Sequence, residues 1–281
     1  YETQSSYFIT LSLTDGIETV TKDVTIAIID INDAAPIFTS DATFSAAENQ
    51  TAIGTVTASD PEGDEFSFSV SGNELVITSA GVLTFASAPD YETKTSYSAM
   101  VTVVDTEDNS ATQDITVNVA NVNDNSPVFT SDATFSAAEN QTAIGTVTAT
   151  DADGDGIVYS ISLSDITINS STGVISFASA PDYETKTSYS ATVTASDGTN
   201  STTQDITISV TDINDNSPVF TSSASFSAAE NQTAIGTVTA TDADGDTVTF
   251  SVSGSELEIT SAGVLTFASA PDYETKTSTQ Q

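Results

Sequence analysis

Residues 206–210 read ITISV, a run in which apolar side chains alternate with Thr207 and Ser209. A period of two puts successive side chains on opposite faces of a β-strand. This strand therefore has one buried face and one solvated face. The stretch YSATVTA at 189–195 alternates in the same way, and its outward Thr residues suit a strand because their β-branched side chains resist helix formation.

The residues around this stretch extend the pattern to a whole domain. No segment of residues 125–215 has apolar residues at helical spacing, and short alternating runs are separated by Gly, Asn, Asp and Ser turns. Seven such runs predict an antiparallel β-sandwich. The predicted strands are 128–135, 143–150, 157–161, 166–168, 174–177, 189–195 and 206–210.

The sequence repeats itself with a period of 91 residues, the spacing between Pro36, Pro127 and Pro218. This period is too long for a solenoid unit of about 20–50 residues and close to a β-sandwich of roughly 100. We therefore expect a tandem array cut from a longer one. Its expected parts are the end of one repeat at 1–33, whole repeats at 34–124 and 125–215, and the beginning of another repeat at 216–281.

Composition excludes several classes of function. The 281-residue chain has 4 basic and 40 acidic residues, a formal net charge of −36, and neither His nor Cys. A zinc or copper centre, a thiol nucleophile and a Ser-His-Asp triad are thus excluded. Nucleic acid would be repelled. No apolar run is long enough to cross a membrane.

The acidic residues recur in fixed motifs: AAEN, PDYE, DINDN before Pro, and TDADGD, with a further Asp in the SDG or VVD turn. Carboxylates grouped with Asn side chains and backbone carbonyls form a set of hard oxygen ligands. Such a set suits Ca²⁺, which takes six to eight oxygens. Softer metals would require the missing His and Cys.

These motifs, in this order and at this spacing over essentially the whole chain, resemble cadherin repeats, in the bacterial cadherin-like variety found as tandem domains of large surface and adhesin proteins. The resemblance implies an all-β fold of tandem seven-stranded Greek-key, immunoglobulin-like β-sandwiches in a linear array. It also implies that Ca²⁺ ions lie at the junctions between successive domains and stiffen the array.

Carried over position by position, the resemblance assigns metal ligands at three junctions. Around Pro36 the expected ligands are Glu2, Asp30, Asn32, Asp33, Asp60 and Asp105. Around Pro127 they are Glu48, Asp90, Glu92, Asn123, Asp124, the carbonyl of Asn125, Asp151, Asp153 and Asp197. Around Pro218 they are Glu139, Asp182, Glu184, Asp212, Asn214, Asp215, Asn216, Asp242 and Asp244.

The motifs depart from the family pattern at three places. The DADGD loop is shorter than in animal cadherins, so the loop carbonyl that helps to bind a third ion has no counterpart. Asn121 stands where the first Asp of the linker is expected. In the first whole repeat, Asp60-Pro61-Glu62 replaces the usual Asp-x-Asp, although Glu62 can still reach the site. We expect Ca²⁺ affinity on the order of 10⁻⁴ M, as in extracellular calcium modules.

The predicted function is a calcium-stiffened structural or adhesive array at the cell surface or outside the cell, secreted or anchored through other parts of the protein. Its expected partners are Ca²⁺ and like arrays on neighbouring cells or chains, or the extracellular matrix. The alternatives are a module that binds carbohydrate or another ligand, and an acidic spacer that needs no metal. An enzyme is not expected, because catalytic carboxylate pairs are seldom copied in tandem.

Overall fold

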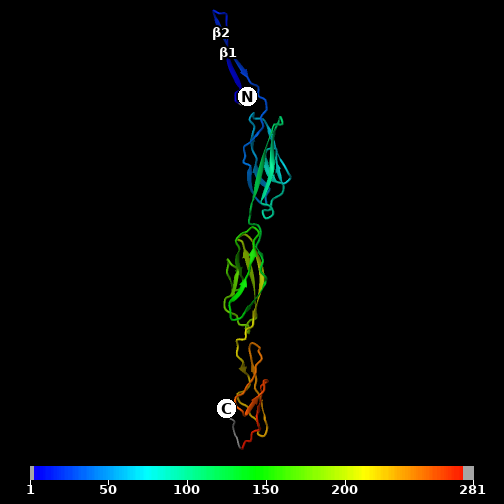
Figure 1. Ribbon diagram of the computed structural model, residues 1–281, viewed down its shortest axis with the longest axis vertical. Helices are drawn as coiled ribbons and strands as arrows, with labels where there is room; N and C mark the ends of the chain where they lie inside the picture. The colour runs from blue at the N-terminus through cyan, green and yellow to red at the C-terminus, as the bar shows by residue number, and fades with distance from the viewer. Residues whose placement is uncertain (1–2, 275–281) are drawn as a thin grey trace. The chain divides into compact units, whose positions relative to one another are not determined.

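The computed structural model describes residues 3–274, and all of their regular structure is β-strand (Figure 1). Within this range no helix could cross a bilayer. The chain divides into two compact units, one ending at Asn125 and the other beginning at Ser126. The prediction of tandem all-β sandwiches is confirmed.

The first unit holds a hairpin and one whole sandwich. The hairpin is β1 and β2, blue in Figure 1. The sandwich has a four-stranded sheet in the order β4-β11-β10-β7, a three-stranded sheet β5-β9-β8, and the short pair β3-β6. The strands are β1 (Ser6–Thr14), β2 (Thr19–Ala27), β3 (Ile37–Phe38), β4 (Thr43–Ala47), β5 (Ala52–Thr55), β6 (Ala58–Ser59), β7 (Phe66–Val70), β8 (Leu75–Ile77), β9 (Val82–Phe85), β10 (Ser96–Asp105) and β11 (Ser110–Ala120).

The second unit holds another whole sandwich, with sheets β13-β20-β19-β16 and β14-β18-β17 and the pair β12-β15. Sheets β22-β25-β24 and β21-β23 follow it. The strands are β12 (Val128–Phe129), β13 (Thr134–Ala138), β14 (Ala143–Thr146), β15 (Ala149–Thr150), β16 (Val158–Ile161), β17 (Ile166–Ile168), β18 (Val174–Phe177), β19 (Ser188–Ser196), β20 (Ser201–Thr211), β21 (Val219–Phe220), β22 (Ala234–Thr237), β23 (Ala240–Thr241), β24 (Leu257–Ile259) and β25 (Val264–Phe267).

The alternating stretches form the centre of each sandwich. Ile206, Ile208 and Val210 on β20 are at most 4% exposed, and Val193 and Ala195 on β19 are fully buried. Their outward neighbours are polar and lie at the surface. Burial of this one face explains why the period-two pattern identified the strands correctly.

Two predicted strands are each divided in two. The expected strand 128–135 consists of β12, which pairs antiparallel with β15, and β13, which pairs parallel with β20. The expected strand 143–150 consists of β14 and β15, which also belong to different sheets. In each of these segments the chain leaves one sheet and joins another. The alternation of apolar residues continues through the change of sheet, so the sequence pattern does not reveal it.

A tight turn closes the sandwich at Gly173, which has a φ of +69°. The Gly173 carbonyl accepts a 2.9 Å hydrogen bond from the backbone of Val147. A Cβ atom at position 173 would lie 2.1 Å from the Val147 carbonyl oxygen. Only glycine fits here, because both the backbone conformation and the close approach of another segment exclude a side chain.

We expect Gly173→Ala to destabilise the protein by more than the roughly 1–2 kcal/mol that a left-handed conformation alone costs an L-residue. The extra loss arises because the new methyl group meets backbone atoms. Gly154→Ala is the matched control, since Gly154 has a φ of +82° with open space around it. Urea unfolding of both variants measures the difference, and equal losses would contradict the packing argument.

Candidate metal centre

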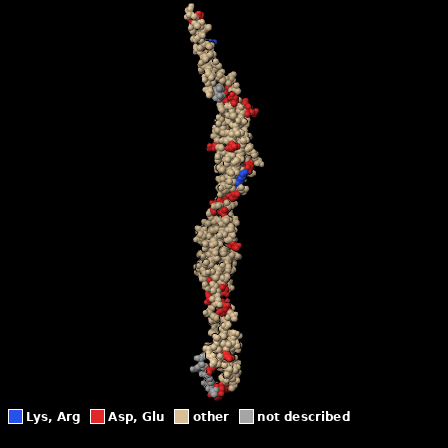
Figure 2. All heavy atoms as spheres, viewed as in Figure 1, with Lys and Arg blue, Asp and Glu red and all other residues tan. Residues whose placement is uncertain are grey.

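The acidic side chains are gathered in groups rather than spread evenly (Figure 2). Several of these groups place three carboxylates with their oxygens within 4.8 Å of one another. Carboxylates at such distances repel unless a cation or hydrogen-bond donors lie between them. The groups are built by the AAEN, PDYE, linker and TDADGD motifs.

The glutamate of AAEN is buried and joins three segments of its repeat. Glu139 is 2% exposed. Its Oε2 accepts a 2.8 Å hydrogen bond from the backbone N–H of Tyr183 in the PDYE loop, and its Oε1 accepts one of 2.8 Å from Ile213 in the linker. Glu48 does the same with Tyr91 and Val122, at 2.7 and 2.8 Å. The same residue type therefore fixes both flanking segments in each whole repeat.

The asparagine that follows this glutamate adds a second connection. Asn140 has a φ of +60°, a left-handed conformation that asparagine tolerates better than most residues. Its backbone N–H donates to the Pro181 carbonyl at 3.0 Å, and its side chain donates to Asp215 at 2.5 Å. Asn49 has a φ of +61° and donates from its side chain to Asp124 in the same way.

The group around Pro218 lies within the second unit. Glu139, Glu184 and Asp215 form one set of neighbouring carboxylates, and Glu184, Asp212 and Asp244 form another. Glu184 belongs to both sets. The motifs of one repeat and the TDADGD loop of the next are thus brought together here.

Donors from the linker lie among these carboxylates. The Asn216 side chain donates to Asp244 and Asp215 at 2.8 Å each, and to Glu184 at 3.2 Å. Asp244 also accepts from the backbone N–H groups of Asp215 and Asn216, at 3.1 and 2.8 Å. The Asn214 side chain donates to Asp246. These contacts place the linker directly against the TDADGD loop.

The pKa shifts reflect this crowding. Loss of contact with water raises the pKa of Asp212, and the charges of Asp244 and Glu139 raise it further. Desolvation raises the pKa of Glu184 as well, with added repulsion from Glu139 and Asp244. The pKa of Asp244 is lowered, chiefly because the Asn216 side chain donates to it. A cation at this group would favour the ionised form of all three.

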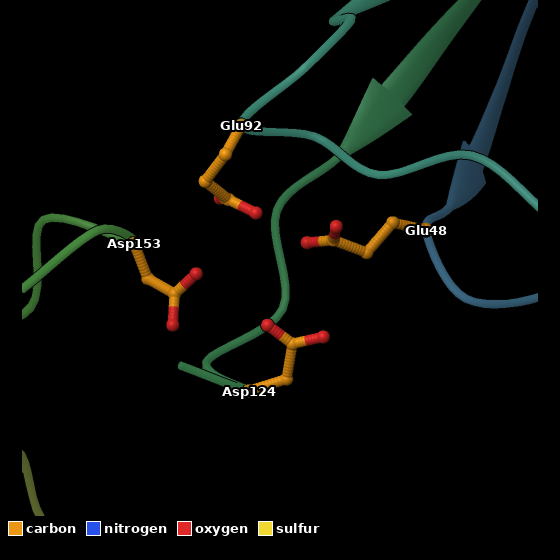
Figure 3. A group of neighbouring side chains, drawn as sticks. All are labelled: Glu48, Glu92, Asp124 and Asp153. Carbon is orange, nitrogen blue, oxygen red and sulfur yellow. The ribbon is translucent and has the colours of Figure 1, made fainter. Parts of the chain in front are cut away.

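In the first unit, the carboxylates of Glu48, Glu92 and Asp124 face one another from three different segments (Figure 3). The Asn125 side chain donates to Asp124 at 2.9 Å and to Glu92 at 3.4 Å. These three residues hold the same motif positions as Glu139, Glu184 and Asp215 in the second unit.

In the second unit, the TDADGD loop brings Asp151, Asp153 and Asp155 together. Oδ1 of Asp151 accepts from the backbone of Asp153 at 3.0 Å, whereas its Oδ2 is buried and has no hydrogen-bond partner. Asp197 accepts from the backbone of Thr199 and Asn200 at 2.7 and 2.6 Å, which fixes the SDG turn.

Around Pro36, Asp60, Glu62 and Asp64 form a corresponding group in the first unit. Oδ1 of Asp60 accepts from the backbone of Glu62, Gly63 and Asp64 at 3.0–3.1 Å, and its Oδ2 is buried without a partner. Glu62 therefore does occupy the place of the second Asp. Desolvation raises the pKa of Asp64, with repulsion from Asp60 and Glu107.

Asp105 connects this loop to the preceding linker. It is 7% exposed and accepts from the backbone of Glu107 and Asn109 at 2.9 and 2.8 Å, and from the Asn109 side chain at 2.8 Å. Burial alone would raise the pKa of Asp105, but these hydrogen bonds lower it. Asn109 also donates to Asn32 at 3.0 Å, so the linker is held against this turn.

Several predicted ligands shape the turns in which they lie. Asp90 and Asp182 accept from the backbone and hydroxyl of Thr93 and Thr185, at 3.0–3.1 Å, and so close the PDYE turn. Asp242 accepts from the backbone of Asp244 at 3.1 Å. Glu2 lies outside the described residues. The charge of Asp30 adds to the raised pKa of Asp64.

The sequence interpretation missed several acidic and amide residues. Asp64, Asp155 and Asp246 are the third acidic position of their loops, and Glu107 and Asn109 contact the linker at Pro36. The first three carried a signal, because acidic residues alternate in SDPEGD and TDADGD. Glu107 and Asn109 carried no such signal in the sequence, because their partner Asn32 is far away along the chain.

The donor set fits a hard divalent cation. All candidate ligands are carboxylate, amide or backbone oxygens, and the equivalent atoms Asp60 Oδ2 and Asp151 Oδ2 are buried without partners. A buried carboxylate oxygen without a partner is costly unless something binds it. Ca²⁺ is the common biological cation that accepts many such oxygens in an irregular arrangement.

Comparisons with known proteins agree with this architecture. Residues 133–211 match the model of the cadherin domain, and residues 32–118 match that of a bacterial Ig domain. The chain is 32% identical over 252 residues to "Cadherin EGF LAG seven-pass G-type receptor 2" of Mus musculus, covering 79% of this chain and 9% of that protein. It is 33% identical over 247 residues to "Protocadherin Fat 4" of Homo sapiens, covering 78% and 5%.

Among solved structures, the crystal structure of mouse Cadherin-23 EC22-24 matches with a TM-score of 0.69 and 25% identity, over 86% of this chain and 90% of that one. The chain spans less than a tenth of the two curated relatives above. These matches confirm the resemblance: the chain is composed of cadherin-like repeats. The cadherin relatives indicate an extracellular repeat array of the adhesion type.

We expect Glu139→Gln to lower the stability of the metal-free protein by about 1–3 kcal/mol, because an amide NH₂ would then face a buried backbone N–H. The matched control is Glu184→Gln, which removes an exposed carboxylate from the same group. Relief of repulsion should leave the control unchanged or slightly more stable. Urea unfolding in EGTA makes the comparison, and equal stability of both variants would show that Glu139 acts only through its charge.

Proposed function

We propose that the junction carboxylates bind Ca²⁺ and that the bound ions stiffen an extracellular adhesion-type array. The ligands are those that the resemblance assigned at each junction, joined by the third acidic residues Asp64, Asp155 and Asp246. The observation that carries the proposal is the group around Pro218, where two repeats contribute carboxylates to one cluster.

The electrostatics support this function. Two like charges 4 Å apart repel by about 1 kcal/mol in water and by more near a protein surface. Glu139, Glu184, Asp212, Asp215 and Asp244 all belong to this cluster. Without metal, only hydrogen-bond donors such as Asn216 offset the repulsion. Ca²⁺ would neutralise it and connect the linker to both flanking repeats.

The same motifs recur at the other junctions, so the same role is proposed there. At Pro127, Glu48, Glu92 and Asp124 of the first unit correspond to Glu139, Glu184 and Asp215. Asp151 and Asp153 of the second unit correspond to Asp242 and Asp244. At Pro36, the linker acids would act with Asp60, Glu62 and Asp105.

The expected affinity supports a function outside the cell. Modules of this ligand type bind Ca²⁺ with dissociation constants of about 10⁻⁴–10⁻³ M, which match extracellular calcium rather than the cytosol. The similarity to cadherin repeats supports an adhesive array on a cell surface, with like arrays or matrix as partners. Near-identical copies also suit a spacer that holds another domain away from the surface.

We expect Asp244→Asn to weaken Ca²⁺ binding at the Pro218 junction by about tenfold or more, because it removes one charge and one ligand oxygen from the site. The melting-temperature gain on adding Ca²⁺ should fall with it. Isothermal titration calorimetry and thermal melts measure both quantities. The matched control is Glu258→Gln on β24, an exposed acid outside the groups described here, which should behave as wild type.

The proposal fails if the wild-type chain shows no Ca²⁺ binding up to several millimolar, or if Asp244→Asn and the control bind alike. In the first case the chain would be an acidic spacer that needs no metal. Small-angle scattering adds a readout of stiffness, since the particle should be longer with Ca²⁺ than in EGTA.

Adhesion between like arrays is tested separately from calcium binding. Beads coated with the chain should cluster with Ca²⁺ and disperse in EGTA, because stiff arrays present their surfaces in a fixed orientation. Beads coated with Asp244→Asn should need more Ca²⁺ to cluster. Calcium binding without clustering would leave the spacer function and remove self-adhesion, and binding of glycans on an array would favour the ligand-binding alternative.

A further inference from the structure

The linkers at Pro127 and Pro218 differ by one carboxylate. Asp212 begins the linker DINDNSP, whereas Asn121 begins the corresponding NVNDNSP. The linker at Pro36 also begins with an aspartate, Asp30. Asn121 therefore replaces a charged group by a neutral amide of nearly the same size at this position.

The backbone next to this position is held in the same way in both linkers. The residue that follows it, Ile213 or Val122, donates from its backbone N–H to Glu139 or Glu48 at 2.8 Å. Each glutamate in turn donates from its own backbone N–H to the carbonyl of the residue before the position, at 3.1 Å. The exchange of aspartate for asparagine thus changes the charge of the linker and leaves its backbone contacts in place.

The carboxylate that Asn121 lacks belongs to a compact group in the second unit. One oxygen each of Glu184, Asp212 and Asp244 lies within 4.8 Å of the others. Oxygens that bind one Ca²⁺ at about 2.3–2.6 Å lie at most about 5 Å apart, so a single ion can bind all three. The counterparts of Glu184 and Asp244 in the preceding motifs are Glu92 and Asp153. The Pro127 junction therefore keeps two carboxylates of this group and has an amide as the third.

This difference weakens the binding of a cation for two reasons. An amide oxygen can still bind Ca²⁺, but the affinity of an oxygen site rises with the number of charged ligands. The missing charge also lowers the repulsion among the carboxylates of the metal-free junction, so a bound cation relieves less of it. Both effects reduce the gain that Ca²⁺ brings at Pro127.

We propose that Asn121 makes the Pro127 junction a calcium-sensitive hinge, which releases an ion and becomes flexible at a calcium concentration at which the same junction with aspartate there stays stiff. This regulation depends on the calcium function proposed above. The division between the two compact units falls at the same junction, between Asn125 and Ser126. As calcium falls, the array bends at one defined place.

The first test measures the stiffness of the Pro127 junction in the full 281-residue chain, which has no cysteine of its own. Spin labels on Ser98→Cys and Ser190→Cys lie at exposed positions of the two repeats that flank this junction. The distribution of distances between the labels should narrow as Ca²⁺ is added. Asn121→Asp should lower the calcium concentration at the midpoint of this change by about tenfold, because it adds a charged ligand.

Asn118→Asp is the matched control for this test. Asn118 is exposed on β11, shortly before Asn121, so the variant adds the same charge outside the carboxylate groups. Its midpoint should stay close to that of the wild type, because salt screens exposed charges that do not bind the ion. An equal shift in both variants would mean that only the overall charge matters. That result, or an unchanged midpoint in Asn121→Asp, would overturn the proposal.

The second test makes the reverse change at Pro218, with spin labels on Ser190→Cys and Ser255→Cys. Asp212→Asn should raise the calcium concentration at the midpoint by about tenfold. Asp205→Asn, which removes an exposed charge on the outer face of β20, should leave it unchanged. Equal midpoints in these two variants would contradict the role of the linker position.

The two tests separate this hinge from the calcium function on which it depends. If neither labelled wild-type chain responds to Ca²⁺ up to several millimolar, the calcium function fails and the hinge fails with it. If both respond but the midpoints ignore Asn121→Asp and Asp212→Asn, calcium binding stands and only the hinge is refuted.

Discussion

The rest of each whole repeat depends on one buried carboxylate. Glu139, and Glu48 in the preceding repeat, accept backbone N–H groups from the PDYE loop and from the linker. A carboxylate that accepts two such bonds compensates for its own burial and also satisfies two donors that would otherwise be unpaired. The glutamate thereby fixes the positions of Glu184 and Asp215, which belong to segments far apart in sequence. The acidic group at the junction exists because this contact holds its parts together.

Crowded charge is the second constraint. The raised pKa values of Asp212, Glu184 and Asp64 arise from desolvation and from neighbouring carboxylates, so the metal-free junctions are under repulsion. Asparagine amides and linker N–H groups offset part of it. This repulsion lies at the linkers and not within the sandwiches. A bound cation would therefore stiffen the connection between repeats and leave the apolar cores unchanged.

Strand pairing is the third constraint. In each whole repeat the long hairpin lies between two other strands: β19–β20 lies between β13 and β16, and β10–β11 lies between β4 and β7. The inward residues of these hairpins, such as Val193 and Val101, are fully buried. Each apolar core therefore depends on the central position of its hairpin.

The β-strands, the repeat and the acidic motifs could be predicted from the sequence, because they rest on local properties: the period of two in ITISV, the 91-residue spacing and the recurring carboxylates. The tertiary structure alone decided that the strands at 128–135 and 143–150 are divided between sheets, since apolar alternation does not record which neighbour a strand pairs with. It alone showed that Glu139 is a backbone acceptor and that Asn109 contacts Asn32. Such contacts join residues distant in sequence, and only folding brings them within hydrogen-bond reach.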